Sequence, residues 1–171
     1  MGHLCQDIPI RRRGTWTGWR TENGGKDGRV ASLGITQLIS DLLYAVQALA
    51  GYSAPVQTPA VEFVPHLTLE EMACEGHCDI RGWYAGGGTI YLDDHLDPAN
   101  NLWDRSIVVH EMVHYLQDRA GAFGAVPTCR RWIEREEEAY AVQRRWLRKN
   151  PPRRPAPVYA RFSRMIVDCD S

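Results

Sequence analysis

The chain has 171 residues, of which 20 are basic and 21 are acidic, so its formal net charge is −1. This length suggests one domain with an ordinary core. The balanced charge gives no overall field that would attract nucleic acid, and no apolar run approaches the roughly 20 residues of a membrane-spanning helix. We therefore expect a globular protein that binds no nucleic acid and does not span a membrane.

The first part of the chain lacks a hydrophobic period. Residues 11–32, RRRGTWTGWRTENGGKDGRVAS, are rich in arginine and glycine, which favours an irregular arm over residues 1–32. From Leu33 to Ala50 the apolar residues recur on one helical stripe, and Gly51 follows. This pattern predicts an amphipathic helix that ends near Gly51.

Short strands are predicted in the middle of the chain. The segment Val61–Val64 alternates apolar and polar residues, and Pro65 stops it. After a short helical turn near Leu69, the stretch GWYAGGGTIYLDD predicts a strand, a glycine turn and a second strand at Thr89–Asp93. We expect these strands to form a small, mainly antiparallel sheet.

Two longer helices follow the strands. Asp97-Pro98 and Asn100-Asn101 are breaker and cap signals that introduce a helix running to about Ala120, with Gly121 as its C-terminal stop. A second helix is predicted from about Arg130 to Lys149, where a pair of prolines ends it.

The order of helix, short strands, helix and helix indicates an α+β fold. We expect the domain to cover residues 33–149. The Pro- and Arg-rich tail at 150–171 is expected to pack on this domain, with its last segment, RFSRMIVDC, as a strand or a turn.

The stretch VVHEMVHYLQ holds the strongest chemical pattern of the chain, with His110 and His114 on either side of Glu111. On an α-helix, residues four apart lie on the same face, so both imidazoles can point at one metal ion. Glu111 is rotated by about 100° from His110, which puts its carboxylate beside a metal without binding it. From there it can take a proton from a metal-activated water. The same pattern also arises by chance on ordinary amphipathic helices, so a third ligand is required.

The segment WIEREEEAYAVQRRW offers that ligand. Its apolar residues recur at a helical spacing that turns Glu136 toward the core, where a lone carboxylate is costly. By the same phase Gln143 lies on the buried face, Glu134 and Glu138 point away, and Glu137 is intermediate. An acidic run of this kind is otherwise a solvated face with Glu–Arg pairs. We predict Glu136 as the third ligand, with Glu137 as the fallback. The four other histidines are expected at the surface: His3 lies in the arm, His66 and His95 lie next to turns, and His77 lies in CEGHC.

HEMVH followed by E-x-x-A-Y at 136–140 resembles the gluzincin branch of the zincin metallopeptidases, and the short chain is similar to the minimal gluzincins. The resemblance covers roughly Val61–Leu147 and is specific only at the two helices. It implies a zincin-like fold, one Zn²⁺ per chain and a peptide or protein substrate. It also implies that the free edge of the strand Thr89–Leu92 pairs with an extended substrate. In one departure, Tyr140 stands where the family often has an aspartate that orients a histidine ligand.

Other side chains are candidates for support of the site. Gln143 and Tyr140 are candidate partners of the ligands. Donors to the oxyanion of a tetrahedral intermediate are sought among four tyrosines, namely Tyr84, Tyr91, Tyr115 and Tyr140. The sequence does not choose between them.

The five cysteines are Cys5, Cys74, Cys78, Cys129 and Cys169, an odd number, so at least one is free or pairs between chains. Two cysteines and a histidine in CEGHC resemble a partial zinc knuckle, but no second pair of ligands is close. A Cys74–Cys78 disulfide is favoured over two free thiols. This cysteine content favours a secreted or periplasmic location over the cytoplasm. No signal-like apolar segment follows Met1, so either the protein is cytoplasmic or its signal is absent from the chain as given.

Three functional hypotheses follow from the sequence. The first is zinc-dependent peptide-bond hydrolysis, with Glu111 as general base and His110, His114 and Glu136 as ligands. The second is a zinc-binding protein-interaction module without peptidase activity. In the third, the chain binds no metal at all.

Overall fold

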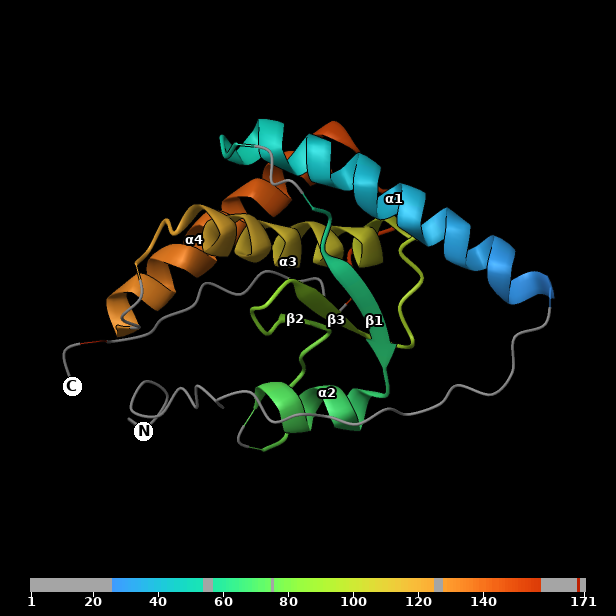
Figure 1. Cartoon of the computed structure of the whole chain (residues 1–171), viewed down its shortest axis with the longest axis horizontal. Coiled ribbons are helices and arrows are strands. Elements are labelled where there is room, and N and C mark those ends of the chain that lie inside the picture. The colour runs from blue at the N-terminus through green and yellow to red at the C-terminus, as the bar shows by residue number, and fades with distance from the viewer. Residues whose placement is uncertain (1–25, 54–56, 75, 125–127, 158–168, 170–171) are drawn as a thin grey trace.

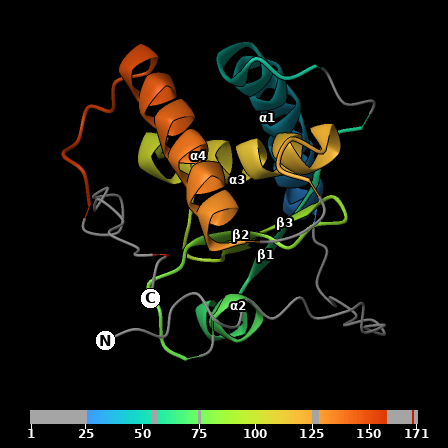
Figure 2. The same ribbon diagram turned by 90° about the vertical axis from the view of Figure 1, so that its left-hand side faces the viewer.

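A computed structural model describes residues 26–53, 57–74, 76–124, 128–157 and 169. The elements in chain order are α1 (Lys26–Ala50), β1 (Ala60–Val64), α2 (His66–Ala73), β2 (Gly82–Tyr84), β3 (Thr89–Asp93), α3 (Leu102–Ala120) and α4 (Cys129–Lys149). In Figure 1 the sheet lies between α3 on one face and α2 on the other. Figure 2 shows α1 and α4 side by side, crossing α3 on the side away from the sheet. The expected α+β class is therefore confirmed.

Helix α1 is longer than the sequence predicted, because it begins at Lys26 and not at Leu33. The added residues contain no proline, and a single glycine costs only about 1 kcal/mol within a helix, so nothing in this stretch prevents the extension. The buried stripe of α1 consists of Ile39, Leu42, Leu43 and Val46. The predicted irregular arm, as far as residue 25, lies outside the described residues.

The sheet has the strand order β1-β3-β2 and is mixed. Strand β1 runs parallel to β3, whereas β2 is antiparallel to β3. The expectation of a mainly antiparallel sheet was therefore wrong, because the chain leaves β1 through α2 and β2 before it returns as β3 in the same direction. The predicted glycine turn between β2 and β3 is present, with positive φ at Gly86, Gly87 and Gly88.

Strand β3 places different side chains on the two faces of the sheet. Ile90 and Leu92 are fully buried in the core with residues of α3. Successive side chains of a strand point to opposite faces, so Tyr91 and Asp93 lie on the face that α2 covers. As the central strand, β3 is paired on both sides, and the free edges belong to β1 and β2.

The predicted bounds of the two C-terminal helices are confirmed to within a residue or two. The side chain of Asn101 accepts a hydrogen bond from the Trp103 amide and caps the start of α3. After Ala120, Gly121 adopts the left-handed conformation and ends the helix. Thr128 caps α4 in the same way, since its side chain accepts from the Arg131 amide. Helix α3 is buried without interruption from residue 108 to residue 117 because α1, α4 and the sheet surround it.

The C-terminal tail contacts the domain where the structure describes it. The Trp103 indole donates a hydrogen bond of 2.9 Å to the Arg154 carbonyl, and a disulfide joins Cys129 to Cys169. Most of the segment RFSRMIVDC, residues 161–168, lies outside the described residues. Within the described part of the chain, no helix is both long enough and apolar enough to cross a membrane.

Candidate metal centre

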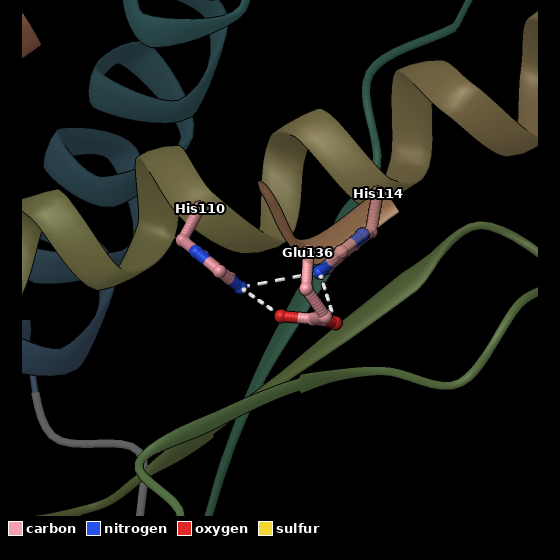
Figure 3. Close-up of side chains that lie close together, drawn as sticks. All are labelled: His110, His114 and Glu136. Atoms are coloured by element: carbon pink, nitrogen blue, oxygen red, sulfur yellow. Dashed lines mark hydrogen bonds and ion pairs between the residues drawn. The ribbon is translucent and has the colours of Figure 1, made fainter. Parts of the chain in front are cut away.

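Helix α3 presents His110 and His114 one turn apart on its α4 side (Figure 3). Their Nε2 atoms lie 3.1 Å apart, and both residues are buried, with exposed fractions of 8% and 7%. Both imidazoles therefore point at the same small region of space, as the four-residue spacing predicted.

Glu136 of α4 reaches this region from the facing helix. Its Oε2 lies 3.2 Å from His110 Nε2, and its Oε1 lies 3.0 Å from His114 Nε2 (Figure 3). We call these three side chains the ligand cluster. Glu137, the fallback ligand, is exposed and has no place in the cluster.

The prediction that Glu138 points away from the core was wrong. Its Oε2 accepts hydrogen bonds of 2.8 Å from Tyr52 Oη and from Gln117 Nε2. The reason is that α4 packs against both α3 and the end of α1, so the covered face of α4 is wider than its apolar stripe.

The charges of the ligand cluster depend on one another. Burial alone would raise the pKa of Glu136, but hydrogen bonds with His110 and His114 outweigh burial and hold that pKa well below its usual range. Burial disfavours the charged form of His114, whereas Glu136 favours it, and the net effect raises the pKa of His114. In the described part of the chain, Glu136 forms ion pairs with these two imidazoles and with no lysine or arginine.

This set of donors fits a divalent transition-metal ion. Two imidazole nitrogens and one carboxylate form a set found at catalytic zinc. Donors about 2.0–2.1 Å from one zinc ion lie about 3.3 Å apart in a tetrahedron. The contacts of 3.0–3.2 Å between the three side chains are close to this spacing. The ligand cluster could therefore hold zinc with little rearrangement.

Glu111 lies beside the cluster and is held against β2. Its Oε2 accepts a hydrogen bond of 2.9 Å from the Tyr84 amide. Gly82 makes room for it, because a Cβ at that position would lie 2.9 Å from Glu111 Cγ and 2.7 Å from Ile107 Cγ2. Burial raises the pKa of Glu111, although His110 and His114 act in the opposite direction.

The strand whose edge adjoins Glu111 is β2, not β3. The Arg81 carbonyl accepts from the Asp93 amide, so Arg81 directs its backbone groups toward β3. Backbone groups alternate along a strand, so those of Gly82 and Tyr84 point to the free edge, where the Tyr84 amide meets Glu111. The expectation of a free edge on Thr89–Leu92 was therefore wrong, because both of its edges are paired.

Of the four candidate tyrosines, Tyr140 contacts the ligand cluster. Its ring centroid lies 4.4 Å from that of His110. Burial, Glu136 and Glu111 raise the pKa of Tyr140 to about 12. The other three have different partners: Tyr84 donates to Asp118, Tyr115 donates to the Gln57 carbonyl, and Tyr91 stacks on Trp83.

Two glutamines lie near the cluster, and the one that contacts a ligand is not the one that the sequence suggested. The predicted partner, Gln143, donates a hydrogen bond of 3.0 Å to Ser106 Oγ. Its Oε1 and His110 Nδ1 are both buried without a hydrogen-bond partner in the described part of the chain. The contact to a ligand comes instead from Gln117, whose Oε1 lies 2.8 Å from His114 Nδ1. Sequence reasoning missed Gln117, although it lies three positions after His114 and therefore on the same helical face.

A second polar cluster lies on the α2 side of the sheet and is built around Asp93, which is fully buried. Asp93 Oδ2 lies 2.7 Å from Arg81 Nη1 and 2.8 Å from His66 Nδ1, and its Oδ1 lies 2.9 Å from His95 Nδ1. His66 Nε2 also faces Glu70, at 3.5 Å. We call these five side chains the Asp93 cluster. His66 is therefore partly buried, whereas His95 is exposed as predicted.

The favoured Cys74–Cys78 disulfide is formed. With the Cys129–Cys169 bridge, the described residues hold two disulfides. Neither the spacing of Cys129 and Cys169 nor their local sequence indicated that second pair.

A family model described as a domain of unknown function (DUF6647) matches residues 32–152. The matched segment includes the ligand cluster, Glu111, β2 and the Asp93 cluster. No curated protein and no solved structure matches the chain.

Proposed function

The chain belongs to the DUF6647 family, and we propose that it is a zinc-dependent peptidase of the gluzincin kind. One observation carries this proposal: two imidazole nitrogens and a carboxylate converge at 3.0–3.2 Å in a buried position, with a further carboxylate beside them. A zincin-like arrangement would further require a strand edge next to the general base, and β2 meets that requirement.

His110, His114 and Glu136 would hold the metal. A bound Zn²⁺ would leave one coordination position for water, lower the pKa of that water to about 7, and polarise a substrate carbonyl. His110 and His114 are buried and Glu136 is partly buried, and the largely dry surroundings strengthen electrostatic interactions at the site.

Glu111 would act as the general base and then as the general acid. Its carboxylate would take a proton from the attacking water and later deliver it to the leaving amine. The Tyr84 amide holds this carboxylate at the edge of β2. The same contact therefore fixes the direction in which Glu111 faces a peptide bound along that edge.

The substrate would be an extended peptide that pairs with the free edge of β2. The Gly82 backbone groups and the Tyr84 carbonyl point outward, which is the arrangement that β-augmentation uses, while the Tyr84 amide is held by Glu111. Because β2 has three residues, backbone pairing would cover only a short part of the substrate, and side chains would supply the remaining selectivity.

The alternative function is a zinc-binding protein-interaction module without peptidase activity. One observation favours it: Glu111 is itself only 6% exposed and already accepts a hydrogen bond from Tyr84. A carboxylate in such a position can serve the packing of β2 on α3 without taking part in a reaction.

A Glu111→Gln variant separates the two functions. For a peptidase we expect one zinc per chain, as in the wild type, and a rate of peptide-library cleavage that falls by about 10²–10⁴-fold. The exposed Glu134→Gln change on α4 is the matched control and leaves both quantities unchanged. Cleavage by Glu111→Gln at the wild-type rate contradicts the proposal, and zinc binding without cleavage by the wild type supports the alternative.

We also infer that the protein works in an oxidising compartment, outside the cytoplasm. Two disulfides are formed in the described residues, and such bonds persist mainly in secreted and periplasmic proteins. Thiol titration of protein isolated from its native source tests this inference. Four cysteines that react only after reduction are expected, whereas immediate reaction of all five contradicts it.

A further inference from the structure

The imidazole of His114 has a defined hydrogen-bond partner on the side away from the ligand cluster. Its Nδ1 lies 2.8 Å from Gln117 Oε1, in a buried position. An amide oxygen can only accept a hydrogen bond. Gln117 therefore favours the neutral form of His114 with the hydrogen on Nδ1, in which the lone pair of Nε2 can bind a metal. Without a metal, Glu136 Oε1, 3.0 Å from Nε2, favours the other form.

The orientation of the Gln117 amide is itself determined by its neighbours. Its nitrogen lies 3.0 Å from the Arg135 carbonyl oxygen and 2.8 Å from Glu138 Oε2. Both of these groups only accept hydrogen bonds. The nitrogen must therefore face them, and the oxygen must face His114.

Glu138 connects this contact to a third part of the chain. Its Oε2 also accepts a hydrogen bond of 2.8 Å from Tyr52, which follows α1. The series Tyr52, Glu138, Gln117 and His114 thus joins the end of α1, α4 and α3. Gln117 is only 2% exposed, so water does not compete effectively for these hydrogen bonds.

His110 provides an internal comparison. Its Nδ1 is buried and has no hydrogen-bond partner among the described residues. No described group therefore favours the Nδ1–H form of His110, whereas Glu136 Oε2, 3.2 Å from its Nε2, favours the Nε2–H form when no metal is bound. The two imidazoles of the ligand cluster therefore differ in how firmly their metal-binding forms are set.

We propose that Gln117 is a positioning residue that fixes the metal-binding tautomer of His114, and that Glu138 holds Gln117 in the required orientation. This inference rests on the proposed function, because it assigns a role to Gln117 through the metal. Partners of metal-binding histidines typically change metal affinity by 10–100-fold when they are removed.

The first experiment compares Gln117→Leu with Gln47→Leu. Both glutamines are buried, but Gln47 lies on α1 and its Nε2 has no partner among the described residues. Competition with a chelator is expected to show zinc affinity about 10–100-fold weaker for Gln117→Leu, with no change for Gln47→Leu. Equal affinity in the two variants overturns the inference.

A second readout does not depend on zinc. Two-bond ¹H–¹⁵N spectra of metal-free Glu136→Ala protein, in which the carboxylate that faces Nε2 is removed, report which nitrogen of a neutral His114 carries the hydrogen. This variant is expected to show the Nδ1–H form, and the double variant with Gln117→Leu a mixture of both forms. A wild-type protein that binds no zinc, together with the Nδ1–H form in Glu136→Ala, contradicts the proposed function alone. A mixture already present in Glu136→Ala overturns the inference.

An exchange of the two side chains tests the part that Glu138 plays. Gln117→Glu alone brings two carboxylates together and is expected to weaken zinc binding. Adding Glu138→Gln restores a donor toward position 117, while the oxygen that faces His114 is kept. The double variant is expected to bind zinc at least about tenfold more tightly than Gln117→Glu alone. An equal or weaker affinity overturns the role of Glu138.

Discussion

The ligand cluster and the Asp93 cluster occupy opposite faces of the same small sheet, and both combine a carboxylate with two imidazoles. They differ in how the negative charge is balanced. Asp93 lies 2.7 Å from the Arg81 guanidinium, which is a permanent cation. In the described structure Glu136 pairs with two histidines and with no arginine or lysine.

This difference indicates which cluster suits a metal. The side chains of Asp93, Asp94 and His95 also bring possible ligand atoms close together. There, however, a metal would have to compete with Arg81 and His66 for the Asp93 carboxylate. In the ligand cluster a divalent cation would meet no arginine or lysine paired with Glu136 among the described residues. The proximity of ligand atoms is therefore a weaker indication of a metal site than the charged groups that surround those atoms.

The largest effect is expected from a substitution that removes a member of the ligand cluster. Glu136→Ala removes one of three donors, so zinc affinity is expected to fall by more than about 100-fold, beyond the effect of removing a partner of a ligand. Glu137→Ala, one position along and exposed, is the control and keeps one zinc per chain. Metal analysis of the purified variants measures both. Loss of zinc from His95→Ala, with retention in Glu136→Ala, would mean that the metal binds at the Asp93 cluster and not at the ligand cluster.

The next largest effect is expected from a substitution in the Asp93 cluster, and it concerns the stability of the folded protein. Asp93→Ala leaves Arg81 and His66 without their carboxylate and is expected to cost about 2 kcal/mol or more of the free energy of unfolding. The exposed Asp94→Ala change is the control, with a change within about 0.5 kcal/mol. Urea denaturation measures both, and zinc content is expected to remain the same in both variants.

The same cluster gives a direction to the pH dependence of stability. Burial opposes ionisation of Asp93, but hydrogen bonds from His95 and Arg81 outweigh it, and the pKa of Asp93 lies below its ordinary value of 3.8. A lowered folded-state pKa adds stability above that ordinary value, which is lost as the pH falls through the folded-state pKa. The wild type should therefore lose this contribution below about pH 4, and Asp93→Ala should show a flatter acid profile. Parallel profiles would contradict the role of Asp93.

A smaller effect is expected at β2, the strand that carries Glu111. Gly82→Ala places a Cβ 2.7 Å from Ile107 Cγ2 and 2.9 Å from Glu111 Cγ, so Glu111 must shift. We expect hydrolysis to fall by about tenfold and stability by about 1–3 kcal/mol, with zinc content unchanged. Gly76→Ala is the control, because a Cβ there meets nothing within 4 Å. Unchanged hydrolysis in Gly82→Ala would show that the placement of Glu111 does not matter.

The smallest effect is expected at Tyr140. Its ring packs on His110, and Tyr140→Phe keeps the ring, so zinc affinity should change by no more than about twofold. Tyr140→Ala removes the ring and should weaken binding further. Isothermal titration with zinc compares the variants. A large loss of affinity in Tyr140→Phe would mean that the hydroxyl, and not the ring, supports the ligand cluster.

The sequence alone determined what depends on one element at a time. The four-residue spacing put His110 and His114 on one face of α3, and the apolar phase of α4 turned Glu136, not Glu137, toward the core. Helix caps and glycines set the ends of the helices, and the short loop in CEGHC favoured the Cys74–Cys78 bridge. Each of these follows from local geometry, which repeats along the chain and can be read without knowing the fold.

Only the tertiary structure decided what depends on two elements together. The strand order made β2 the edge beside Glu111 and put β3 in the centre. The packing of α4 against both α3 and the end of α1 turned Glu138 inward. There Glu138 accepts a hydrogen bond from the Gln117 amide nitrogen, so the amide oxygen faces His114. The pairing of Arg81 with Asp93 also required the register of β2 on β3. Docking angles, strand order and register arise from the competition of all elements for burial, and no single period in the sequence encodes them.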